Sequence, residues 1–220
     1  MIMYNIIATG SKGNSVLYED RDFGTTFLID LGVPYKDVEE YLNDVNLIFL
    51  THKHSDHFDR STIKRVGREH PDIILVVPEH MVEEIKELNY AGRIFVIESN
   101  RKFKYDSIIV EAVTLFHDVP NVGYKIITAN NFKLIHCTDT GSISHIKAKG
   151  YDLYAIEHNY READMIEKIK RKINDGLYAY EVRSKENHLS FDQAESWIEE
   201  QQKDDSKVIK LHISSFYVDN

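Results

Sequence analysis

The chain has 220 residues, of which 42% are hydrophobic and 29% charged, and its formal net charge is −9 at pH 7. This composition is typical of a globular protein and excludes a disordered, collagenous or coiled-coil chain. The acidic balance argues against a protein that grips long nucleic acid through many phosphates, since such proteins carry a basic footprint. Met1–Gly10 lacks the basic segment of a signal peptide, no apolar run reaches the roughly 18 residues of a membrane span, and the single Cys137 excludes an intrachain disulfide. We therefore expect a cytoplasmic protein without a membrane partner.

Short strands dominate the first half of the chain, and helices are interspersed throughout. Apolar residues that alternate with polar ones, or that run on between turn residues, predict strands over Tyr4–Ala8, Val16–Glu19, Thr25–Asp30, Val45–Thr51, Ile73–Val77, Arg93–Ile97, Arg101–Tyr105, Ser107–Val113, Tyr124–Thr128, Phe132–His136, Leu153–Ile156 and Val208–Ile213. Helical spacing of apolar residues predicts helices over Lys36–Leu42, Ser61–Glu69, Glu79–Leu88, Arg161–Asn174 and Ser190–Gln202, with Ser190 as the last helix's N-cap. No repeat or linker interrupts this pattern, so we expect one domain over residues 1–220.

The segment Thr51-His52-Lys53-His54-Ser55-Asp56-His57 has the pattern H-x-H-x-D-H and places four potential metal ligands within six residues. It directly follows the apolar run Val45–Thr51. Imidazole and carboxylate at this density suit Zn²⁺ or a similar divalent ion. Residues two apart on extended backbone face the same way, so His52 and His54 can hold one ion. Asp56 and His57 lie past a turn and can reach a second ion about 3.5–4 Å away.

This motif, placed after an apolar strand, resembles the signature of the metallo-β-lactamase superfamily. Gly10–Ser15 and Phe27–Gly32 lie upstream, where that superfamily has a Gly/Asn/Ser loop and a strand ending in Asp. Five further segments follow in the order of the superfamily: Phe116-His117-Asp118, Cys137-Thr138-Asp139-Thr140-Gly141, Ile156-Glu157-His158-Asn159, Asn187-His188-Leu189-Ser190 and Leu211-His212-Ile213-Ser214. The set resembles the phosphodiesterase branch, which includes the tRNA 3′-processing nuclease, the YycJ/WalJ-like proteins and phage anti-Pycsar cyclic-nucleotide phosphodiesterases.

The resemblance implies an α/β (α+β) fold, the four-layer αββα sandwich, with two divalent metal ions held by side chains. The implied ligands are His52, His54 and His117 for one ion, Asp56, His57 and His212 for the other, and Asp139 as a bridge. Zn²⁺ is the ion expected first and Mn²⁺ the alternative. A hydroxide bridging the ions would be the nucleophile. Considered singly, His117 and His212 also fit structural core histidines, and Asp139 fits a turn residue.

Two further residues are candidates for moving protons. Glu157 follows an apolar strand, and His188 precedes a predicted helix. In the tRNA-nuclease relatives, a Glu and a His in similar places protonate the leaving oxygen. Asp56 is expected to be catalytic as well as a ligand, and Asn187 stands where relatives have glycine. The alternative is that Glu157 pairs with a surface cation and that His188 caps a helix.

Residues that contact the substrate are predicted next. The loop Thr9–Ser15 places Ser11 and Asn14 where they can contact phosphate, and its alternative role is to support the metal loop. His158 is expected to line the pocket. The aromatic residues near these segments, which can stack on a base or pack in the core, are Tyr160, Phe216 and Tyr217.

The function expected first is hydrolysis of a small nucleotide, with cyclic mononucleotides leading, by a two-metal phosphodiesterase. The resemblance to anti-Pycsar phosphodiesterases further implies a homodimer, removal of a nucleotide immune signal and, for a phage-encoded protein, action in the host cytoplasm. The first alternative is a compact metal-dependent nuclease, either a YycJ/WalJ-like exonuclease or a tRNA 3′-processing enzyme, which a basic groove at the site would favour. The second alternative is a metal-binding module without hydrolytic activity, and the complete ligand set argues against it.

Overall fold

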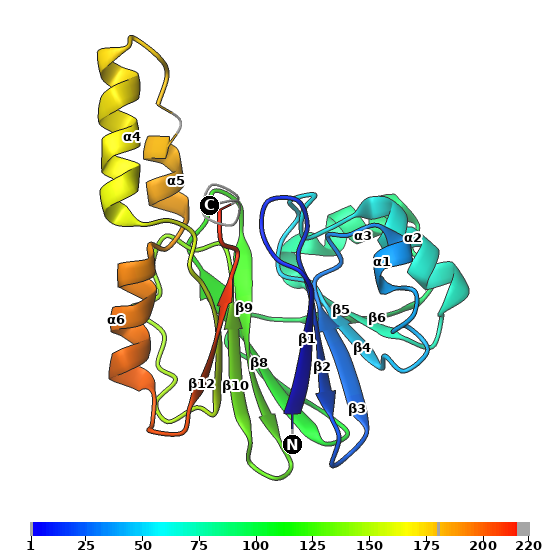
Figure 1. Cartoon of the computed structure of the whole chain (residues 1–220). Coiled ribbons are helices and arrows are strands. Elements are labelled where there is room, and N and C mark those ends of the chain that lie inside the picture. The colour runs from blue at the N-terminus through cyan, green and yellow to red at the C-terminus, as the bar shows by residue number, and fades with distance from the viewer. Residues whose placement is uncertain (1, 180, 215–220) are drawn as a thin grey trace.

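The computed structural model describes residues 2–179 and 181–214 and contains two six-stranded sheets that pack face to face (Figure 1). The first sheet has the order β1 (Ile2–Ala8), β2 (Ser15–Asp20), β3 (Thr25–Ile29), β4 (Leu47–Phe49), β5 (Ile74–Pro78) and β6 (Arg93–Ile97). The second has the order β12 (Lys207–Leu211), β11 (Leu153–Glu157), β10 (Lys133–Cys137), β9 (Asn121–Thr128), β8 (Ile108–Leu115) and β7 (Lys102–Tyr105). Each sheet is mixed, because β1–β3 and β7–β10 pair antiparallel whereas β3–β6 and β10–β12 pair in parallel.

Helices cover the outer face of each sheet (Figure 1). Those on the first sheet are α1 (Tyr35–Val38), α2 (Arg60–Glu69) and α3 (Val82–Leu88), the last preceded by the 3₁₀ turn η1 (Glu79–Met81). On the second sheet lies α6 (Phe191–Gln201), while α4 (Glu162–Asn174) and α5 (Glu181–Asn187) form a pair that projects from the sandwich (Figure 1). These layers confirm the predicted αββα sandwich.

The central strands β3–β5, β10 and β11 are buried on both faces, as packing between layers requires, whereas the outer strands are partly exposed. Along β3, Phe27 and Ile29 join the core between the sheets, whereas Leu28 joins the core under α1–α3. A third core packs Ile135 of β10 against Trp197 of α6. This construction leaves the ends of the strands, and not their faces, free to carry a site.

Most predicted elements form, although several of their bounds differ and one helix was not predicted. The first helix ends at Val38 instead of Leu42, and the strand before the histidine motif ends at Phe49, so that Thr51 lies in the loop. Helix α5 was not predicted, because its sequence contains one apolar residue, Val182, and therefore has no apolar periodicity. The Ser190 N-cap is confirmed: its hydroxyl accepts from the Gln193 amide in a full capping box.

Within residues 2–179 and 181–214, none of the helices combines the length and the apolar character that crossing a bilayer requires.

Candidate metal centre

The candidate ligands lie just past the carboxyl ends of four strands. The loop His52–His57 follows β4, His117 follows β8, Asp139 follows β10 and His212 follows β12. Side chains from these loops approach one another closely enough to hold metal ions. The ends of strands from both sheets therefore build one site.

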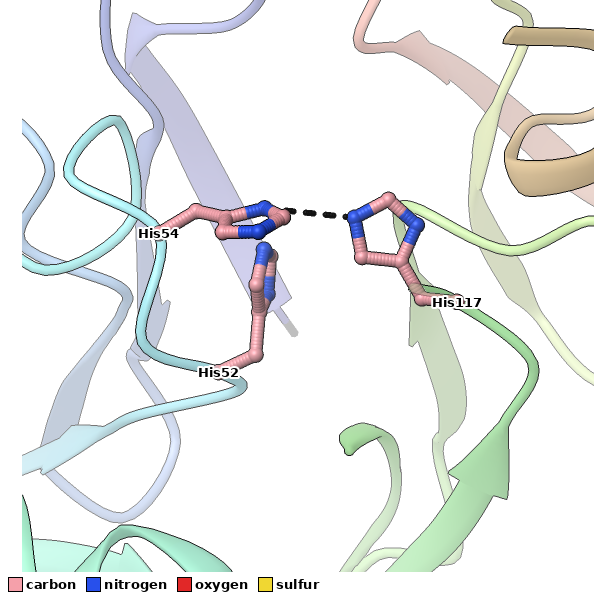
Figure 2. A group of neighbouring side chains, drawn as sticks. All are labelled: His52, His54 and His117. Carbon is pink, nitrogen blue, oxygen red and sulfur yellow. Dashed lines mark hydrogen bonds between the residues drawn. The ribbon is translucent and has the colours of Figure 1, made fainter. Parts of the chain in front are cut away.

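In the first cluster, one nitrogen each of His52, His54 and His117 lies within 4.8 Å of the other two (Figure 2). His54 Nδ1 and His117 Nε2 are 3.2 Å apart. His52 Nδ1 lies 3.0 Å from Thr51 Oγ1, and His117 Nδ1 donates a 3.1 Å hydrogen bond to the Asn187 carbonyl. These contacts engage Nδ1 of both rings and leave Nε2 with its lone pair. Burial lowers the pKa of His52 and of His117, which favours the neutral form that binds metals.

The second cluster consists of Asp56, His57 and His212. Asp139 lies beside it, with Oδ2 2.7 Å from His57 Nε2 and Oδ1 3.3 Å from His212 Nε2. Asp139 and His57 also group with His52 of the first cluster, so Asp139 adjoins both clusters. Asp139 and His212 both have left-handed backbone conformations, with φ of 57° and 50°. Such conformations are disfavoured outside glycine and concentrate at functional sites.

The side chains of the two clusters fit two divalent cations. Among the residues that the structure describes, His52 Nε2 is buried without a hydrogen-bond partner, which is unusual for a native polar atom. Burial lowers the pKa of His57, but the charges of Asp139 and Asp30 outweigh burial and raise it to about 10. The same negative charge would stabilise a metal cation. Imidazole and carboxylate donors suit Zn²⁺ and other first-row divalent ions.

Asp30 belongs to this site, although sequence reasoning assigned it no role beyond ending a strand of the superfamily pattern. Its carboxylate accepts hydrogen bonds of 2.8 Å from both the amide and the hydroxyl of Thr51. It also accepts a 2.6 Å hydrogen bond from His57 Nδ1. Asp30 therefore orients His57 directly and His52 through Thr51. The sequence feature that could have indicated this role is a single acidic residue directly after the apolar run Phe27–Ile29.

The loop Thr9–Ser15 supports the metal loop, which is the alternative role considered for it. Asn14 is buried and donates through Nδ2 to the Asp56 carbonyl at 3.1 Å. The same nitrogen lies 2.8 Å from His57 Nε2. Ser11 is exposed at the turn of this loop. Asn14 thus acts on the ligands, and its contact with substrate stays a prediction.

The structure does not bring His158 to the clusters. Its Nδ1 donates to the Ile156 carbonyl at 3.0 Å, and its ring packs 5.3 Å from that of Phe191. The physical reason is the alternation of side chains along a strand, since Glu157 points toward the clusters and its neighbour points away. Tyr160 is 1% exposed and forms a bridge to Ser190, in agreement with core packing. The other two aromatic candidates, Phe216 and Tyr217, lie outside the described residues.

Glu157 and His188 form a close pair beside the clusters. His188 Nδ1 donates a 2.6 Å hydrogen bond to Glu157 Oε1, and the amides of Thr140 and Leu189 donate to Oε2 at 2.9 and 3.2 Å. Burial lowers the pKa of His188, but the charge of Glu157 outweighs burial and raises it above its ordinary value. Glu157 is fully buried, so it does not pair with a cation on the surface. The residue that caps α6 is Ser190 and not His188.

Comparison with known proteins agrees with this geometry. Residues 27–213 match the family described as the beta-lactamase superfamily domain. Exodeoxyribonuclease YycJ from Bacillus anthracis is 28% identical over 171 residues, or 71% of this chain, and the chain spans 62% of that relative's length. The short form of human tRNase Z has a TM-score of 0.73 at 17% identity, over 99% of this chain and 94% of that one. A diphosphatase of the PhnP family has a TM-score of 0.66 at 15% identity, over 97% and 87%.

The two solved structures share the fold with this chain, and the family match extends from β3 to the last histidine of the second cluster. The two His/Asp clusters are consistent with a binuclear metal site. This chain therefore belongs to the metallo-β-lactamase superfamily.

Proposed function

We propose that this protein is a metal-dependent phosphodiesterase that hydrolyses small nucleotides, with cyclic mononucleotides as the leading substrates. The observation that carries the proposal is the position of Asp139. Its carboxylate adjoins both metal-site candidates and lies 3.4 Å from Nδ1 of His188, the histidine paired with Glu157. Two ions and a proton donor at one place would supply the nucleophile, the charge stabilisation and the leaving-group proton that cleavage of a phosphodiester can use.

Each group of residues has a distinct part in this reaction. His52, His54 and His117 would hold one ion, and Asp56, His57 and His212 the other, with Asp139 shared. When bound, the ions supply Lewis acidity and a nucleophile derived from water at neutral pH. Glu157 holds the proton of His188 Nδ1, which leaves Nε2 of that ring to donate to the leaving oxygen.

Space and charge support a small substrate. A pocket of about 400 Å³, within the range of small-molecule sites, lies beside His117 and is lined by residues 115–120 with Glu186 and Asn187. Phe116 in this pocket is 53% exposed and offers an aromatic face to a base. The net charge of −9 disfavours a long polyanion. We rank cyclic mononucleotides first because of the resemblance to anti-Pycsar phosphodiesterases. The same resemblance favours a homodimer and a role in removing a nucleotide signal.

A nuclease is the second candidate, and a specific observation favours it. The sequence relative named above is an exodeoxyribonuclease, and a solved structure of similar fold is a tRNase Z. The same clusters and the same proton donor would serve a polymer. Such a substrate would need a basic groove leading to the site.

The test is turnover by the metal-loaded chain on a substrate panel, with metal content measured on the same sample. The panel contains 3′,5′-cyclic purine and pyrimidine mononucleotides, linear dinucleotides, single-stranded DNA and a tRNA precursor. Cleavage of cyclic mononucleotides with polymers untouched is the expected result. Cleavage of polymers alone, lost steeply with salt, would replace the proposal by the nuclease. Light scattering on the same sample tests the homodimer.

A further inference from the structure

The ligand imidazoles of this site are held from behind by other groups of the chain. Asp30 holds His57 Nδ1, and the Asn187 carbonyl holds His117 Nδ1. For His54, Nδ1 faces His117, and the opposite nitrogen, Nε2, lies 3.3 Å from Oδ1 of Asp118. Carboxylates in this position orient a ligating imidazole and raise its basicity.

Asp118 is itself held by a residue of the projecting helix pair. Its Oδ1 also lies 3.2 Å from His117 Nε2, so this oxygen contacts two imidazoles of the first cluster. Its Oδ2 accepts a 3.0 Å hydrogen bond from Arg183 Nη2 of α5. The same helix ends at Asn187, whose carbonyl holds His117. Helix α5 therefore reaches the first cluster by two separate routes.

We propose that Asp118 is a positioning residue for His54, and that Arg183 fixes it in place. Through this pair, helix α5 sets the affinity of the first metal position, an inference that rests on the proposed binuclear site. The side chains of Arg183 and Asp118 are 69% and 25% exposed. An ion pair this exposed contributes little to folding stability. Its effect therefore belongs to metal binding, where loss of an outer partner typically costs 10–100-fold in affinity.

The experiment is competition for Zn²⁺ between the metal-free chain and a chromophoric chelator, fitted to two dissociation constants. Asp118→Asn should weaken one of the two positions about 10–100-fold and leave the other unchanged. Arg183→Gln should weaken the same position by a smaller factor. Lys185→Gln is the matched control: Lys185 is also a cation of α5 in an ion pair, but its partner Glu162 lies on α4. This control should bind both ions as the wild type does.

A double variant shows whether Arg183 acts through Asp118. In the Asp118→Asn background, Arg183→Gln should have no further effect on either constant. Wild-type affinity in Asp118→Asn, or an undiminished Arg183→Gln effect in that background, would overturn the inference. Circular dichroism of each metal-free variant shows whether it is folded, and the unaffected second position is the internal standard. If the wild type binds no Zn²⁺ at all, the proposed function fails together with this inference. If the wild type binds two ions and Asp118→Asn binds them equally well, only this inference fails.

Discussion

His57 donates a 2.6 Å hydrogen bond from Nδ1 to the carboxylate of Asp30, and both side chains are 1% exposed. The bond keeps one proton on Nδ1, so Nε2, which faces Asp139, is the nitrogen that would bind a metal ion after losing its proton. Through Thr51, which donates twice to the same carboxylate, Asp30 also fixes the start of the loop His52–His57. One carboxylate thus anchors both ends of the metal loop.

Asp30→Asn should weaken Zn²⁺ binding about 10–100-fold, the usual cost of losing an outer-shell partner. Asparagine matches aspartate in size and tolerates the left-handed backbone of this residue, whose φ is 63°. Its single amide oxygen, however, cannot replace the two carboxylate oxygens that receive three hydrogen bonds. Chelator competition measures the change.

Asp59→Asn is the matched control for this prediction. Asp59 lies just past the metal loop and caps α2 by accepting from the Thr62 amide at 2.7 Å. Asparagine is an equally good N-cap. We expect Zn²⁺ affinity in Asp59→Asn to equal that of the wild type. Equal affinity in Asp30→Asn as well would show that the Asp30 carboxylate does not support the site.

His188→Ala should slow hydrolysis most on substrates with a poor leaving group. A general acid contributes about 10²–10⁴-fold when the leaving oxygen must be protonated. The nitrophenolate released from a nitrophenyl diester leaves without protonation, so the rate of hydrolysis of that substrate should fall far less. The measurement is the ratio of kcat on an alkyl diester to kcat on the nitrophenyl diester.

Ser190→Ala controls for local structural damage near His188. It removes the N-cap of α6 and should cost about 1 kcal/mol of stability. It should leave the ratio of the two rates unchanged, since Ser190 makes its hydrogen bonds within the capping box. An equal loss on both substrates in His188→Ala would remove its assignment as the general acid.

The local parts of this site could be predicted from sequence, because short-range patterns determine them. The spacing of His52, His54, Asp56 and His57 after an apolar strand places four donors on one loop. The Ser190 cap follows from a side chain that bonds three residues ahead. The position of His158 was also within reach of sequence reasoning, since it continues the extended backbone after β11 and alternation turns its side chain away from the face of Glu157.

The long-range parts could not be predicted, because they depend on how strands and helices pack. Asp30 and His57 are 27 residues apart, and Asp118 and Arg183 are 65 apart. No periodicity connects such pairs. Asn14 contacts Asp56 across 42 residues, because its loop crosses the metal loop.

Asp56→Ala should reduce bound Zn²⁺ from two ions to one per chain. Turnover should fall by more than 100-fold, because loss of a residue that only supports a ligand already costs about 10–100-fold. Its side chain is 23% exposed and contacts His57 and His212 at 3.6 and 3.5 Å. The three apolar cores do not include it, so the free energy of unfolding of the metal-free chain should fall by only about 1–2 kcal/mol, the cost of losing its contacts with the two histidines. Metal analysis, turnover and urea unfolding on one preparation check these three outcomes.

Chelation of the wild type extends the same prediction. We expect activity to disappear while the circular dichroism spectrum stays nearly unchanged, because the buried cores and not the ions hold the sandwich together. Retention of two ions and full activity by Asp56→Ala would exclude the second cluster as a metal site.

His136 should make the stability of the fold depend on pH. It is 2% exposed on β10, and Tyr18 Oη lies 2.9 Å from its Nδ1. Burial lowers its pKa to about 3, whereas an unfolded chain binds this proton below about pH 6.5. The unfolded state therefore holds more protons between these values. The stability that neutral His136 provides is complete above about pH 6.5 and is lost as pH falls, by up to about 1.4 kcal/mol per pH unit.

His136→Gln isolates this effect, since glutamine can bond Tyr18 Oη but does not titrate. The variant should be less stable than the wild type at neutral pH, and the difference should narrow toward pH 4. Urea unfolding of the metal-free chain at about pH 7, 6, 5 and 4 measures both curves. Tyr18→Phe, which keeps His136, should retain the wild-type slope. Parallel curves for His136→Gln and wild type would mean that His136 takes up its proton in the folded state as readily as in the unfolded one.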